Sequence, residues 1–99
     1  MNSKENEILL ITQEECAEVT QAISKCYRFG LDNFKPGKPK TNRQHLAEEL
    51  GDLQAMIDLC TDYDLVDREE VLTAASNKIA KLKQWSTIFK EDTDEDQSK

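Results

Sequence analysis

Hydrophobic residues recur along the chain with the three- and four-residue spacing of amphipathic α-helices, and no segment of useful length alternates as a β-strand does. This pattern predicts three helices: one from about residue 5 to 29, one from about 42 to 62 or 63, and one that follows a cap at Asp67 and ends at residue 89 or 90. Both prolines and two of the three glycines fall within residues 30–40, which are therefore predicted to form a loop. We expect an all-α protein whose antiparallel helical bundle is completed by oligomerisation, because a chain of 99 residues buries only a modest core.

Local signals support these boundaries. Gly30 is suited to end the first helix, and Thr41 with Gln44 has the spacing of a capping box for the second. Asp67 can cap the third helix. Gly51 lies inside the second helix, where glycine costs close to 1 kcal/mol relative to alanine. We therefore expect a neighbouring helix or a ligand to approach closely at Gly51.

Two acidic pairs, Glu15 with Glu18 and Glu49 with Asp52, lie on the apolar stripes of the first two helices. The first acid of each pair stands in the middle of its stripe, and the second stands three residues on, at the edge. At about 100° per residue, the stripes comprise Ile8, Ile11, Val19, Ala22 and Cys26 around Glu15, and Leu46, Leu53, Met56 and Cys60 around Glu49. A buried, unpaired carboxylate costs several kcal/mol unless a cation or a strong partner is present. Four carboxylates from two helices therefore predict a divalent metal bound through oxygen.

A lysine interrupts the stripe of the third helix in the same way. Lys78 shares its face with Val71, Ala75, Leu82, Trp85 and Phe89. An acidic quartet together with a core-facing lysine suggests a metal and a ligand that carries phosphate. The loop before the second helix carries Lys35, Lys38, Lys40 and Arg43, and it is either a solvated basic loop or a cover for an anionic ligand.

Net charge and cysteines narrow the class of protein. The formal net charge is −7, of which residues 91–99 contribute −4, so we expect a helical domain at 1–90 and a disordered acidic tail at 91–99. The basic residues form no long stripe that would bind nucleic acid, and no apolar run approaches a membrane span. The three cysteines have no CxxC spacing and no signal peptide precedes them, so we expect reduced thiols that pack in the core of a cytoplasmic protein.

The acidic residues have two other interpretations. Glutamates are common on solvated helix faces, but that explanation has to account for two pairs on apolar stripes and a lysine on a third. A di-iron bundle would need Glu-x-x-His motifs, whereas the only histidine, His45, stands four residues before Glu49. Oxygen ligands favour Mg²⁺ or Mn²⁺, and His45 is expected to support a ligand or to lie on the helix surface.

At these positions the chain resembles the MazG-like all-α nucleoside triphosphate pyrophosphohydrolases, over roughly residues 8 to 85. The similar segments are EECAE at 14–18, EELGD at 48–52, KCYRFG at 25–30, TNR at 41–43, and Asn77 with Lys78. The short single-domain form is most similar to phage-encoded or related bacterial members, which would place the protein in a cytoplasm. The resemblance implies a Mg²⁺-dependent enzyme, with Mn²⁺ as a substitute, that cleaves a nucleoside triphosphate to the monophosphate and pyrophosphate.

The resemblance also implies roles for individual residues. Glu15, Glu18, Glu49 and Asp52 would hold the metal, and Lys78 and Asn77 would contact the triphosphate. Arg28, Lys25 and Lys81 are further candidates for phosphate contact, and either Glu14 or Glu48 would orient the attacking water. Family members are commonly homodimers or homotetramers.

A second function class stays open at this stage. A non-enzymatic helical module that binds a nucleotide or regulates a partner would use the same buried charges for salt bridges between subunits, with Lys78 paired to Glu15 or Glu49. The base and sugar preference, the number of metal ions and the choice between dimer and tetramer also stay open.

Overall fold

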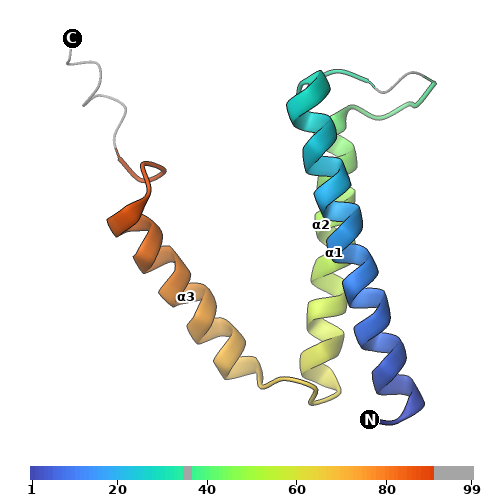
Figure 1. Ribbon diagram of the computed structural model, residues 1–99, viewed down its shortest axis with the longest axis vertical. Helices are drawn as coiled ribbons and strands as arrows, with labels where there is room; N and C mark the ends of the chain where they lie inside the picture. Colours follow the sequence, from blue (N-terminus) through green and yellow to red (C-terminus); the bar gives the residue numbers. More distant parts are fainter. Residues whose placement is uncertain (35–36, 91–99) are drawn as a thin grey trace. The chain divides into compact units, whose positions relative to one another are not determined.

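The structure, a computed structural model, describes residues 1–34 and 37–90. Within these ranges it contains three helices and no strand: α1 (Ser3–Phe29), α2 (Asn42–Asp62) and α3 (Arg68–Trp85) (Figure 1). The all-α fold predicted from the sequence is confirmed. Residues 91–99, where the acidic tail was predicted, lie outside the described residues.

The caps predicted for α1 and α2 are present. Asn2 and Glu5 form a capping box at the start of α1, so this helix begins two residues earlier than its apolar pattern indicated. Gly30 ends α1 with φ of 91°, a conformation that glycine adopts without strain. Thr41 and Gln44 form the predicted capping box of α2.

The third helix is shorter than predicted. Asp67 caps α3 by accepting a hydrogen bond from the Glu70 amide, as expected, but the helix ends at Trp85 and not at residue 89 or 90. Ser86 is extended, and its hydroxyl accepts a hydrogen bond from the Ile88 amide. This local bond replaces a helical one, which is how serine commonly competes with helix formation.

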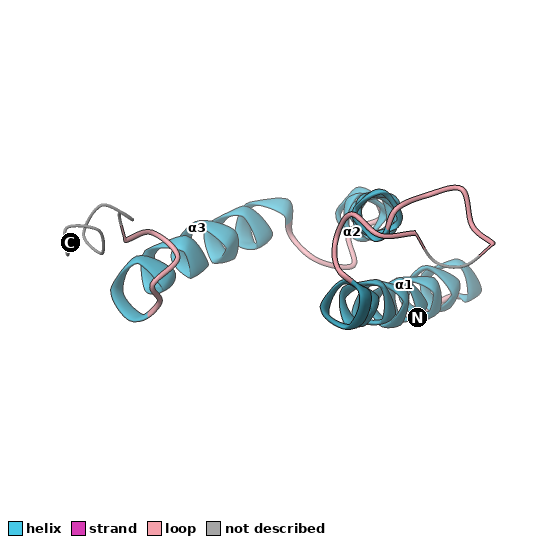
Figure 2. Cartoon of the chain, turned by 90° about the horizontal axis from the view of Figure 1, so that it is seen from above, coloured by secondary structure: helices cyan, strands magenta, loops and turns pink. Residues whose placement is uncertain are grey.

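The chain divides into a first unit, Met1–Leu65, and a second unit that begins at Val66. In the first unit α1 and α2 lie side by side and antiparallel (Figures 1 and 2). Ile8 from α1 packs with Met56 and Cys60 from α2, and Ile11, Leu59 and Leu65 surround them. Val19 and Ala22 are buried further along α1, so its apolar stripe faces α2 as the helical period predicted.

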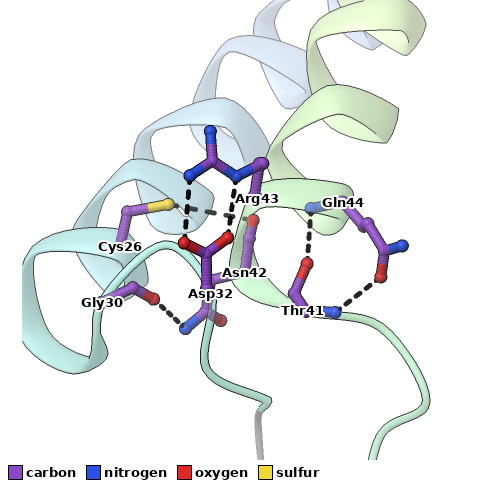
Figure 3. Close-up of polar contacts among 7 residues, drawn as sticks. All are labelled: Cys26, Gly30, Asp32, Thr41, Asn42, Arg43 and Gln44. Carbon is purple, nitrogen blue, oxygen red and sulfur yellow. Dashed lines mark hydrogen bonds and ion pairs between the residues drawn. The ribbon is translucent and has the colours of Figure 1, made fainter.

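The two ends of the α1–α2 loop are tied together by polar contacts (Figure 3). The Asn42 side chain, only 3% exposed, donates a hydrogen bond to the Gly30 carbonyl at 2.9 Å. The Arg43 guanidinium binds both carboxylate oxygens of Asp32, at 2.9 and 3.1 Å. This pairing lowers the pKa of Asp32, first through the hydrogen bond and then through the charge of Arg43. The loop therefore leaves α1 and enters α2 at a fixed point.

The second unit contains α3, and no residue of this helix is buried. Lys78 is exposed, and Trp85 on the same stripe is 80% exposed. The expectation that Lys78 faces a core is therefore not met within its own unit, because a single helix has no second layer to cover its apolar face.

Gly51 also differs from its expectation. A Cβ atom added to Gly51 would have no heavy atom of the described chain within 4 Å, so nothing there approaches closely enough to require glycine.

Candidate metal centre

Three of the four predicted metal ligands come together between α1 and α2. Carboxylate oxygens of Glu15, Glu49 and Asp52 all lie within 4.8 Å of one another. Glu15 projects from α1, whereas Glu49 and Asp52 are one turn apart on α2 and so share one face of that helix. Three negative groups at this separation repel one another unless a proton or a cation lies among them.

Burial and the repulsion between the carboxylates affect Glu15 most directly. Its Oε1 atom is buried and has no hydrogen-bond partner among the described residues. Burial raises the pKa of Glu15, and the charges of Asp52 and Glu49 raise it further. Three carboxylates, one of them with an orphaned oxygen, offer the oxygen donors that a hard divalent cation prefers.

Glu49 is held in place from the opposite side. Its side chain is only 13% exposed, and its Oε2 atom lies 3.2 Å from Nε2 of His45, one turn earlier on α2. His45 therefore supports a candidate ligand, which is one of the two roles expected from its position. A ring nitrogen beside a ligating carboxylate fixes the orientation of that carboxylate.

Glu18 does not join the group of three. It is exposed, and three residues of helix rotate it about 60° away from Glu15, towards the edge of the stripe. Glu14 is exposed as well. The helical period predicted that Glu15 and Glu49 lie together between the two helices, and the structure shows this arrangement. Of the first acidic pair, only Glu15 joins the group.

The other predicted site residues fall into both units. Lys25 of α1 is partly buried, and Arg28 is exposed with its guanidinium 4.9 Å from the centre of the Phe29 ring. Asn77, Lys78 and Lys81 are exposed on α3 in the second unit.

A pocket of about 390 Å³ lies next to the acidic group. Its lining consists of Lys25, Lys38, Pro39, Lys40, Asn42, His45 and Glu48. Lys40 pairs with Glu48 at 2.6 Å, and this hydrogen bond lowers the pKa of Glu48. Lys38 and Lys40 of the basic loop are therefore part of a cavity wall, whereas Arg43 binds Asp32 and Lys35 lies outside the described residues. The pairing of Glu48 with Lys40 was not predicted from the sequence. The two residues are eight positions apart and lie on either side of the helix start, so helical periodicity does not relate them.

None of the helices described is both long enough and apolar enough to cross a membrane. The three cysteines are free; Cys60 is buried and Cys26 partly buried, but Cys16 is exposed, so core packing does not hold for all three.

Comparison with known families relates most of the chain to one of them. The family model described as the MazG nucleotide pyrophosphohydrolase domain matches residues 3–86. No curated protein and no solved structure matches the chain significantly. The matched range includes all three helices, the acidic group and the pocket.

The pH dependence of stability tests the strain at Glu15. Its raised pKa means that the folded chain holds this proton more tightly than the unfolded chain, so metal-free protein loses stability as pH rises from 4.5, the ordinary value, through the raised pKa. We expect Glu15→Gln to remove this loss. Asp32 and Glu48 have lowered pKa values, so their contribution disappears only at lower pH, as pH falls.

The measurement is the melting temperature in EDTA from about pH 4.5 to neutrality, with Glu7→Gln, an exposed acid of α1, as the matched control. The advantage of Glu15→Gln over wild type should grow with pH and then level off. Parallel pH profiles for all three proteins would show that Glu15 is not strained.

Proposed function

The chain belongs to the family of MazG nucleotide pyrophosphohydrolases, and from that premise we propose that it hydrolyses a nucleoside triphosphate between the α- and β-phosphates. The products are the nucleoside monophosphate and pyrophosphate. The observation that carries the proposal is the grouping of Glu15, Glu49 and Asp52, in which Oε1 of Glu15 is buried and has no hydrogen-bond partner among the residues that the structure describes. A nucleotide substrate reaches a protein as a complex with a divalent cation, and a cation is the positive charge that these three carboxylates need between them.

The proposed cation is Mg²⁺, with Mn²⁺ as a substitute. Glu15, Glu49 and Asp52 would hold it, and Glu18 would join through a change of rotamer, because it lies one turn from Glu15 on the same helix. All of these donors are oxygens, as hard cations prefer. When bound, such an ion neutralises charge on the phosphates and lowers the pKa of water near it.

The residues around the acidic group orient the reactants. His45 keeps the Glu49 carboxylate directed into the group. Either Glu14 or Glu48 orients the water that attacks the α-phosphorus, as the bond from the α-phosphorus to the bridging oxygen breaks. Lys78 and Asn77 contact the triphosphate, with Lys25, Arg28 and Lys81 as further contacts, so that positive charge meets the leaving pyrophosphate.

We propose that residues 1–90 act as one domain and that this domain assembles into a homodimer or a homotetramer, which completes a four-helix bundle. Large apolar side chains are exposed in both units, including Leu9, Leu10, Ile23 and Leu50 in the first and Leu72, Ile79 and Trp85 in the second. Contiguous exposed apolar area marks surfaces that bind another protein molecule, and we propose that these side chains supply it.

A panel of ribo- and deoxynucleoside triphosphates, with separate detection of pyrophosphate and inorganic phosphate, tests the activity and gives the base and sugar preference. The proposal expects pyrophosphate and the monophosphate in equal amounts with Mg²⁺, and neither with EDTA. Release of inorganic phosphate alone would contradict cleavage at the α–β bond. No turnover of any member would favour a non-enzymatic nucleotide-binding or regulatory module.

Replacement of Glu49 tests the ligand assignment. Glu49→Gln keeps the shape of the side chain but removes the charge that a cation needs, so activity and most Mn²⁺ binding should be lost while helix content is unchanged. Metal-free stability should stay equal or rise, because one of three repelling carboxylates is gone. Calorimetric titration with Mn²⁺ gives the affinity, and an affinity equal to that of wild type would reject Glu49 as a ligand.

Lys78→Met tests the phosphate contact. Methionine matches the length of lysine and suits the neighbouring Val71 and Leu82, and Lys78 is exposed, so metal-free stability should change by less than about 0.5 kcal/mol. Turnover should fall steeply, whereas Lys83→Met, another exposed lysine of α3, should retain it. If Lys78 instead pairs with a buried carboxylate, metal-free stability should drop by roughly 3–5 kcal/mol.

A further inference from the structure

The pocket beside the acidic group has a chemistry of its own. Three lysines, Lys25, Lys38 and Lys40, face one glutamate, Glu48, which leaves a formal charge of +2 on the lining. The volume of about 390 Å³ is large enough for a small anion with its water. Within the described part of the chain, the lining contains no phenylalanine, tyrosine or tryptophan. Its one aromatic ring, the imidazole of His45, lies with Nε2 3.2 Å from the Glu49 carboxylate.

Two links join this pocket to the acidic group. His45 lines the pocket and also lies 3.2 Å from the Glu49 carboxylate. Glu48 lines the pocket and precedes Glu49 in the chain, and a ligand atom from each of His45, Glu48 and Glu49 lies within 4.8 Å of the others. A ligand that extends over a few atoms therefore reaches both places at once.

Figure 3 shows the contacts at the loop ends, which fix the segments that carry the lysines. Lys38 and Lys40 come just before the buried Asn42, whose side chain binds the Gly30 carbonyl and whose own carbonyl accepts a hydrogen bond from Cys26 Sγ at 3.8 Å. Lys25 is the neighbour of Cys26 on α1. The lysines thus enter the pocket from the loop and from α1, two segments that are fixed to each other before any ligand binds.

We propose that this pocket binds the β- and γ-phosphates of the substrate, the part of the molecule that leaves as pyrophosphate. The assignment to the leaving group rests on the proposed hydrolysis at the α–β bond. Lysine is a compact, hydrated charge that suits phosphate, and the pocket adds Lys38 and Lys40 to the phosphate contacts. The base and sugar lie outside the pocket, because its free charges are lysines, while the Asn42 amide is bound to the Gly30 carbonyl and His45 contacts Glu49.

The Lys40–Glu48 pair is the part of the pocket that changes on binding. Both side chains are about half exposed, at 49% and 47%, so exchanging this partner costs little. A phosphate oxygen takes the place of the Glu48 carboxylate on Lys40. Glu48 is then released next to His45 and Glu49, where it adds one acid to the group that faces the α-phosphate.

Calorimetric titration with inorganic pyrophosphate in EDTA tests the pocket without any contribution from a metal. We expect Lys38→Gln with Lys40→Gln to weaken binding by roughly tenfold or more, because two charges that face the anion are lost. Glu48→Gln should tighten binding about threefold, since it removes the negative charge and frees Lys40. The matched control is Lys4→Gln, a lysine 21 residues before Lys25 on α1, which should leave the affinity unchanged.

Opposite effects of the lysine and glutamate variants, with the control unchanged, would establish the pocket. Wild-type protein that binds no metal-free pyrophosphate, or variants that all behave alike, would overturn it. If the double variant fails to fold, the gain in affinity for Glu48→Gln still decides. A protein that binds pyrophosphate through Lys38 and Lys40 but hydrolyses no nucleotide would reject the proposed function and keep the anion site. If the protein hydrolyses a nucleotide but its affinity for pyrophosphate does not depend on these lysines, the proposed function stands and the anion site is rejected.

Discussion

The placement of one carboxylate oxygen, Glu15 Oε1, is the constraint on which the account of this protein depends. The atom is buried between two helices, has no partner among the described residues, and lies in a group with the carboxylates of Glu49 and Asp52. Its environment raises the pKa of Glu15, first by burial and then by the neighbouring charges. Such a group destabilises the metal-free fold and becomes favourable when a divalent cation binds, so the apolar contacts of α1 and α2 have to hold it together until then.

Other contacts in the first unit position the three carboxylates. Ile8, Met56 and Cys60 set the pairing of α1 with α2. The capping box at Thr41 and the Asn42 contact to Gly30 fix where α2 begins, and with it the rotation that points Glu49 and Asp52 at Glu15. The same contacts place the lysines of the loop beside the acids. Acidic and basic side chains thus lie next to each other, with Lys40 and Glu48 paired where they meet, and this arrangement fits the proposed binding of both a cation and a phosphate anion.

Much of the fold and of the acidic group could be predicted from the sequence, for reasons that differ between residues. The 3.6-residue period placed Glu15 and Glu49 on the buried faces, and capping chemistry located the start of α2 at Thr41. The period placed Glu18 at the edge of the stripe, about 60° from Glu15, and the structure shows it exposed there. Periodicity extended α3 past Trp85, where the Ser86 hydroxyl ends the helix. Contacts between distant residues, such as Lys40 with Glu48, have no periodic signature and needed the structure.

The most direct test of the central claim is the melting temperature of the wild-type protein in EDTA and in rising concentrations of Mn²⁺. A cation that binds the folded chain alone stabilises it by about 2.7 kcal/mol when its free concentration is 100 times the dissociation constant. If Glu15, Glu49 and Asp52 hold a cation, the melting temperature rises with the Mn²⁺ concentration at neutral pH. A melting temperature that stays constant from EDTA to saturating Mn²⁺ would mean that Glu15, Glu49 and Asp52 hold no metal, and it would contradict the account.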